Sequence, residues 1–493
     1  AEESFSGCAG VTEVIISDGI ERLSSNAFSN CTGLKSITFP KSLNYIGENA
    51  FENCTSLSEI NTENRLPYID EYAFKNCTGL KSISIPDKND YIYSNAFSGC
   101  TNISEISISD NAAGFHSKAF CETAYYKDPS NWDNDVLYIG KHLIDAKSTL
   151  PETYKIREGT KHIAYGAFSS CENLTNVIIP SSINRIDSGA FSGCSKLTNV
   201  SMPNSIEAID NSAFSDCTGI ESISLPENLK IIDNYAFYDC KNLKSITIPS
   251  GVTQIGFYTF RNCTGLTEIT IPGSVEKIDD YAFSGCTKIQ SISLSEGLKS
   301  IGECAFNKCQ SLKSIKIPST ATTVGKSPFK GCSSLNSVSL ADGLSKIPEN
   351  LCSGCTNLKS VLIPDSVTSI EDCAFHGCKN LESVSIPNSV SQIGCDAFSS
   401  CSKLESILLP KKLEKISVAA FSNCKNLKSI KIPSSVTSID YCAFSGCENL
   451  KSVSFSAGIK EIGGKAFSNC KALETLTLPK NLENIDDEAF LNC

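Results

Sequence analysis

The stretch CTGLKSITFPKSLNYIGENAF, residues 31–51, sets a pattern that the chain repeats along most of its length. Ile37 and Phe39 alternate with polar neighbours, which is typical of a half-buried β-strand. Pro40 cannot donate to a strand ladder, so it marks the end of that strand. The remainder, up to Ala50-Phe51, is too short and too β-branched for a long helix. It therefore predicts a second short strand or 3₁₀ turns, and little α-helix.

Cysteine recurs every 23 residues. The series runs from Cys8 to Cys100 and again from Cys171 to Cys493, and 20 of the 26 cysteines occupy this one repeat position. A unit of this length cannot bury its apolar positions alone, whereas stacked units bury them against one another. The sequence thus predicts a β-rich solenoid, with residues 1–493 forming a single domain of about 21 turns. We expect the ladder cysteines to be buried thiols whose S–H groups face backbone carbonyls.

The repeat, written C/N-x-x-L-x-x-I-x-I-P-x-x-L-x-x-I-x-x-x-A-F, resembles the leucine-rich repeat of BspA-like bacterial surface proteins, also called the Treponema pallidum type. The resemblance implies a right-handed superhelix with a parallel β-sheet on its concave face and short strands or 3₁₀ turns on its convex side. It also implies a secreted or cell-surface protein, with adhesion to host or microbial surface proteins or glycans suggested for some members. No signal peptide is present in this sequence, so the extracellular location is an expectation from the resemblance alone.

Charge and hydropathy exclude two classes of partner. The net charge is −11, which argues against nucleic acid because such binding calls for a basic face. No run of about 18 apolar residues occurs, so we expect no membrane span. We expect a monomer without cofactor or metal. No paired acid, base or nucleophile departs from the repeat pattern, so we expect no catalytic residue and no enzymatic activity.

Residues 121–165 interrupt the ladder as an irregular insertion. Two apolar runs on either side of Gly140-Lys141 predict a β-hairpin. The insertion also carries aromatic residues that we consider candidate binding residues: Trp132, Tyr125, Tyr126 and Tyr138. They could form an aromatic platform for a sugar or a protein, or they could pack inward in place of missing repeat side chains. The resemblance favours the second alternative, because a similar insertion recurs in the family as a degenerate repeat.

The strand residues that point away from the core are expected to line one continuous face on the concave side. By register these residues are small hydroxyl side chains, including Ser222, Ser245, Ser291, Ser337, Ser360 and Ser383. This face could be a recognition surface or simply a well-solvated sheet. Leu362 and Leu408 break the pattern two turns apart, with Lys431 one turn beyond, and form a candidate contact patch. The sequence thus favours a non-catalytic protein that binds a partner, and the alternative is a structural spacer with no ligand of its own.

Overall fold

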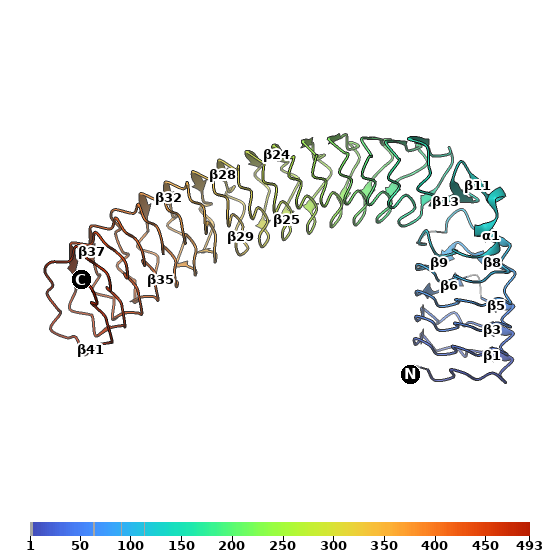
Figure 1. Cartoon of the computed structure of the whole chain (residues 1–493), viewed down its shortest axis with the longest axis horizontal. Helices are drawn as coiled ribbons and strands as arrows, with labels where there is room; N and C mark the ends of the chain where they lie inside the picture. The colour runs from blue at the N-terminus through green and yellow to red at the C-terminus, as the bar shows by residue number, and fades with distance from the viewer. Residues whose placement is uncertain (1–2, 63–64, 90, 113) are drawn as a thin grey trace. The chain divides into compact units, whose positions relative to one another are not determined.

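The computed structural model describes residues 3–62, 65–89, 91–112 and 114–493. The chain forms two compact units, Ala1–Gly219 and Ile220–Cys493, which are described separately here. In each unit, successive turns of about one repeat stack with their strands side by side (Figure 1). The parallel β-solenoid predicted from the sequence is confirmed, and so is the near absence of helix. The prediction of one continuous domain stays a prediction.

A regular turn has two short strands and a third, strand-free side. Strand β3 (Ser36–Thr38) pairs in parallel with the equivalent strand of the turn before and of the turn after, and β4 (Tyr45–Ile46) does the same in a second column. On the third side, backbone hydrogen bonds still join the turns, as from Phe28 N–H to the Ala50 carbonyl at 2.7 Å. All three sides therefore satisfy their backbone groups in neighbouring turns, as a solenoid requires.

The first unit contains both columns and the insertion. Its first-column strands are β1 (Glu13–Ile15), β3, β5 (Glu59–Asn61), β8 (Ser82–Ile85), β10 (Glu105–Ile108), β14 (Thr153–Lys155), β16 (Asn176–Ile178) and β18 (Asn199–Ser201). Its second-column strands are β2 (Arg22–Leu23), β4, β7 (Tyr68–Ile69), β15 (His162–Ile163), β17 (Arg185–Ile186) and β19 (Ala208–Ile209). A further short pair consists of β6 (Arg65–Leu66) and β9 (Lys88–Asn89).

The second unit repeats the same plan without an insertion. Its first-column strands are β20 (Ser222–Ile223), β22 (Ser245–Ile246), β24 (Glu268–Ile271), β26 (Ser291–Leu294), β28 (Ser314–Lys316), β30 (Ser337–Ser339), β32 (Ser360–Leu362), β34 (Ser383–Ser385), β37 (Ser429–Lys431) and β39 (Ser452–Ser454). Its second-column strands are β21 (Ile231–Ile232), β23 (Gln254–Ile255), β25 (Lys277–Ile278), β27 (Ser300–Ile301), β29 (Thr323–Val324), β31 (Lys346–Ile347), β33 (Ser369–Ile370), β35 (Gln392–Ile393), β36 (Lys415–Ile416), β38 (Ser438–Ile439), β40 (Glu461–Ile462) and β41 (Asn484–Ile485).

The core is a set of identical side chains stacked from turn to turn. Phenylalanine rings lie nearly parallel, as between Phe260 and Phe283, whose centroids are 5.2 Å apart. Beside them, each regular ladder thiol donates to the main-chain carbonyl found 26 residues earlier, as from Cys286 Sγ to the Phe260 oxygen at 3.1 Å. All 26 cysteines are free thiols in this structure; most are buried and a few are partly or fully accessible to solvent. The Phe260 carbonyl also accepts the Cys263 backbone N–H at 3.2 Å, so the thiol is a second donor to an oxygen that is already paired.

The third side depends on a left-handed backbone position just before the Ala-Phe pair of each regular turn. Asn49 has a φ of 56° there, and Tyr258 has a φ of 58° at the equivalent place. Positive φ is uncommon for residues other than glycine, and a bulky tyrosine there is an outlier. The hydrogen bonds to both neighbouring turns hold the conformation, so residues of very different size occupy the same backbone site.

The insertion adds the only regular helices found among the described residues. A single helical turn, α1 (Ala124–Lys127), is followed by the 3₁₀-helix η1 (Pro129–Asn131) and by β11 (Trp132–Asp133). The predicted hairpin is confirmed, because β12 (Val136–Ile139) and β13 (His142–Ala146) pair antiparallel around Gly140, whose φ is 58°. Strand β13 then pairs in parallel with β15, so the insertion rejoins the second column.

Candidate functional site

The outward positions of the first strand column form a face of exposed hydroxyl groups in the second unit. The serines proposed from the sequence lie on it and are exposed: Ser222, Ser245, Ser291, Ser337, Ser360 and Ser383. Small side chains of this kind offer hydrogen bonds but little apolar area. The face as a whole is therefore polar and shallow.

Two leucines interrupt this face, as the register predicts. Leu362 is 72% exposed and Leu408 is 78% exposed, the two highest exposures among the large hydrophobic side chains of the described residues. Leu362 is opposite Ser385 in the pairing of β32 with β34, and Leu408 follows Ser385 by one repeat. Exposed Lys431 follows after one more repeat. We call Leu362, Ser385, Leu408 and Lys431 the leucine patch.

The four aromatic residues proposed in the insertion do not form one exposed platform. Tyr138 is only 7% exposed, and its hydroxyl lies 3.1 Å from that of Tyr154 inside the core. Of the two alternatives given above, Tyr138 therefore follows inward packing, because the hairpin turns this ring into the core, and it is not a surface binding residue. Trp132, Tyr125 and Tyr126 are half-buried.

Trp132 and Tyr126 hold each other in place. The indole N–H of Trp132 donates to the Tyr126 carbonyl at 2.7 Å, and the two rings meet edge to face with centroids 5.1 Å apart. The Lys147 ammonium lies 4.4 Å from the Trp132 ring centroid. These contacts give both rings partners inside the insertion, while a binding role for Trp132, Tyr125 and Tyr126 stays a prediction.

A polar hollow of about 450 Å³ lies where the insertion rejoins the regular turns. We call it the insertion hollow. Its lining is rich in hydroxyl groups and glycine, and it contains one cation, one carboxylate, one imidazole and one phenol ring. The residues are His116, Ser117, Lys118, Asp145, Tyr165, Gly166, Ser169, Ser188, Gly189, Ser192, Asn211 and Ser212.

Asp145 is the most deeply buried charged group of this hollow, with a side chain only 2% exposed. Lys118 Nζ lies 2.6 Å from its Oδ2, and the Tyr126 hydroxyl donates to the same oxygen at 2.5 Å. Burial raises the pKa of Asp145, while the Lys118 ammonium and the Tyr126 hydroxyl oppose the rise. The sequence made Tyr126 a candidate binding residue. In the structure its hydroxyl instead donates to the buried carboxylate of Asp145, a residue that the sequence did not indicate.

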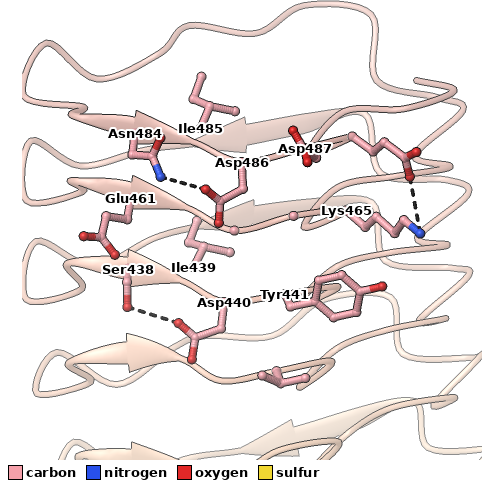
Figure 2. Close-up of a pocket in the computed structure, with 14 residues that line it drawn as sticks. Ser438, Ile439, Asp440, Tyr441, Glu461, Lys465, Asn484, Ile485, Asp486 and Asp487 are labelled. Carbon is pink, nitrogen blue, oxygen red and sulfur yellow. Dashed lines mark hydrogen bonds and ion pairs between the residues drawn. The ribbon is translucent and has the colours of Figure 1, made fainter.

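A second hollow, of about 900 Å³, lies over the last turns of the second unit. Figure 2 shows Asp440 and Asp486 on its acidic wall, two turns apart. Both carboxylates are already engaged, since Ser438 Oγ donates to Asp440 at 3.3 Å and Asn484 Nδ2 donates to Asp486 at 2.7 Å. Its acidic groups therefore mainly satisfy their own neighbours.

Sequence reasoning missed a ladder of tyrosines on the third side of the second unit. The rings of Tyr235, Tyr258 and Tyr281 stack with centroid distances of 4.8 and 5.0 Å, and the Arg261 guanidinium lies 5.0 Å from the Tyr258 centroid. Exposed Phe257 adjoins them. The signal was available, because tyrosine recurs at 23-residue spacing at one repeat position.

The structure supplies no metal cluster or long apolar helix in the part of the chain that it describes. No group of three or more His, Cys, Asp or Glu side chains there is placed to hold a metal ion. None of the helices described is both long enough and apolar enough to cross a membrane.

Comparison with known proteins places the repeat in a defined family. The family model for the BspA type leucine rich repeat region, in six copies, matches residues 1–127, 147–267, 253–382 and 368–493. The unmatched residues between 127 and 147 fall within the insertion. Among curated proteins, none matches the chain.

Solved structures include similar repeat proteins. A leucine-rich repeat protein from Bacteroides ovatus is 26% identical, covers 71% of this chain and 95% of its own, and superposes with a TM-score of 0.55. A second one, from Eubacterium ventriosum, is 24% identical over 65% of this chain and 83% of its own, with a TM-score of 0.40. A leucine rich cell surface protein from Faecalibacterium prausnitzii is 21% identical over 90% and 88%, with a TM-score of 0.29. The repeat match spans most of the chain, and the chain belongs to the family of BspA-type leucine-rich repeat proteins.

Proposed function

We propose that this chain is a non-catalytic, secreted or cell-surface protein that binds a host or microbial surface protein through the leucine patch. Membership of the BspA-type leucine-rich repeat family supports a role in protein interaction. The observation that carries the proposal is the exposure of Leu362 and Leu408 on a face whose other outward residues in the second unit are mostly serine and threonine, with a few charged residues. An exposed leucine side chain gains free energy only when a partner covers it.

The setting of the two leucines suits a protein partner. The two leucines lie two turns apart, which is about 10 Å by strand spacing. The residues around them are mainly serines, whose small side chains allow the backbone of a partner to approach closely. Exposed Lys431 at one end adds a charged group at the rim. Apolar anchors surrounded by polar groups are the usual arrangement of a protein-binding hot spot.

The test is binding of the purified chain to an array of extracellular-matrix and bacterial surface proteins. The double variant Leu362→Ser/Leu408→Ser should lose at least about tenfold in affinity for any protein captured, because two apolar anchors are removed. Ile231→Ser is the matched control, since Ile231 is 47% exposed on the other strand column of the same unit. Unchanged binding by the double variant rules out the leucine patch, and absence of any protein partner for the wild type favours a spacer.

A further inference from the structure

We propose that the insertion hollow binds one or two neutral pyranose rings of a glycan. All of its lining residues lie in the first unit, whereas the leucine patch lies in the second. The proposal therefore adds a site with its own ligand class and does not depend on a protein partner for the leucine patch.

The hollow exists because two successive turns lack a side chain at the left-handed position of the third side. Gly166 and Gly189 stand there, with φ values of 66° and 59°. Other turns carry Asn49 or Tyr258 at this position with φ values of 56° and 58°, so the backbone does not demand glycine. A Cβ atom added at Gly189 would meet nothing closer than 4.0 Å. The glycines thus leave room that the fold fills elsewhere with a side chain.

Ser117 contributes a hydroxyl at the inner edge of the hollow. The residue is 1% exposed, and its backbone N–H is engaged with the Tyr165 carbonyl at 2.9 Å. Its Oγ lies 3.7 Å from the place that a Cβ on Gly166 would occupy, so it borders the empty space. A hydroxyl in this position can both donate to and accept from a ligand hydroxyl.

The charges of the hollow cancel, which favours a neutral ligand. The Lys118 ammonium and the Asp145 carboxylate form a contact at 2.6 Å, so the hollow offers both a donor and an acceptor without net charge. His116 is neutral as well: burial lowers its pKa, and its Nδ1 accepts the Lys118 backbone N–H at 3.1 Å, which leaves Nε2–H as the donor. An anion or a cation would have to break the ion pair to gain a partner.

The remaining groups are those that recognise sugars. Serine hydroxyls, the Asn211 side chain and a phenol ring, that of Tyr165, converge on a volume of about 450 Å³, which suits a mono- or disaccharide. Sugar hydroxyls both donate and accept, so they can pair with hydroxyl, carboxylate and amide groups together. The CH faces of a pyranose ring are apolar enough to pack against an aromatic side chain.

The experiment uses the full chain and named probes. Saturation-transfer NMR and calorimetry would be run with the methyl glycosides of glucose, galactose, mannose and N-acetylglucosamine and with their β-linked disaccharides. Gly189→Tyr should fill the hollow, because tyrosine already occupies the equivalent position at Tyr258, and binding should fall by at least about tenfold. Asn49→Tyr introduces the same residue at the same repeat position away from the hollow, and it should bind as the wild type does.

Two further variants keep the test decisive. Ser117→Ala removes one hydroxyl without adding volume and should weaken binding about threefold to tenfold, so it serves if Gly189→Tyr folds poorly. Leu362→Ser/Leu408→Ser should leave sugar binding unchanged, which separates this proposal from the proposed protein contact. Wild-type chain that binds none of the probes at millimolar concentration, or binding that survives both Gly189→Tyr and Ser117→Ala, would overturn the sugar site.

Discussion

At the scale of single residues, the first unit keeps several ionisable groups out of water beside one another. Asp187 is the clearest case, with a side chain 15% exposed and Arg185 Nε at 3.9 Å from its Oδ1. Burial, and then repulsion from Asp210, raise the pKa of Asp187 to about 7, although Arg185 opposes the rise. The folded chain therefore holds a proton on Asp187 at pH values where the unfolded chain has already released it.

This pKa shift predicts a pH dependence of stability. An unfolded aspartate titrates near pH 3.9, so the contribution of Asp187 is complete below about pH 4 and is lost as pH rises through about 7. Asp187→Asn should lessen that loss, by at most about 4 kcal/mol in the free energy of unfolding. Melting curves between pH 4.5 and 8 would show it, with exposed Asp365→Asn as control. Parallel pH profiles for the wild type and Asp187→Asn would contradict the shifted pKa.

At the scale of one turn, the stacked core can accommodate an exchange at one position through a second exchange in the same turn. Most turns place alanine and phenylalanine in sequence, but one turn has Leu351 and Cys352 there, both fully buried. The larger residue of the pair is now the first one, Leu351, so the two side chains together have about the same volume as Ala and Phe. Because Cys352 replaces the phenylalanine, the stack of rings is interrupted between Phe329 and Phe375. Such compensation is expected of a close-packed interior.

The compensation can be measured with a double-mutant cycle. Cys352→Phe alone should overpack against Leu351 and cost about 1–3 kcal/mol, and Leu351→Ala alone should open a cavity and cost about 2–4 kcal/mol. The double variant restores the usual Ala-Phe pair and should approach wild-type stability, which gives a favourable coupling energy. Urea unfolding of the four proteins would report it. Strictly additive losses would show that the two positions do not share one space.

The turn is also the scale at which sequence prediction succeeded. Periodicity alone located the first strand of most turns, the proline that follows this segment in thirteen turns, and the core cysteine, which occupies its repeat position twenty times. The hairpin around Gly140 could be predicted from its two apolar runs. The orientation of Tyr138 and the hollow beside Gly166 could not, since both depend on how an irregular segment rejoins regular turns. The paired glycines at 166 and 189 were visible signals that only a comparison by repeat position would have singled out.

At the scale of the whole molecule, each turn depends mainly on its two neighbours, so no group far along the chain compensates for a local defect. The thiols make this arrangement measurable. Burial raises the pKa of Cys286 to about 12, which suppresses the thiolate that reacts with disulfide reagents. The buried ladder should therefore remain unreactive as long as the stack is intact.

Thiol titration is the corresponding prediction. With an aromatic disulfide reagent at pH 8, the native chain should react quickly only at its less buried cysteines, namely Cys8, Cys121, Cys373, Cys395, Cys442 and Cys493. After unfolding in guanidinium without reductant, all 26 should react. A much lower count after unfolding would mean that disulfides exist in the protein in solution. Mass spectrometry of the alkylated chain would then locate them.

The left-handed position on the third side has a consequence for engineering. Its backbone is set by the turns above and below, and it already accommodates residues as different as Gly189, Asn49, Cys304 and Tyr258 at nearly the same φ. Successive positions of this kind recur once per turn, at the spacing of stacked strands, about 4.8 Å. Within each unit, chemical groups could therefore be attached at regular spacing, one per turn, without redesign of the surrounding structure.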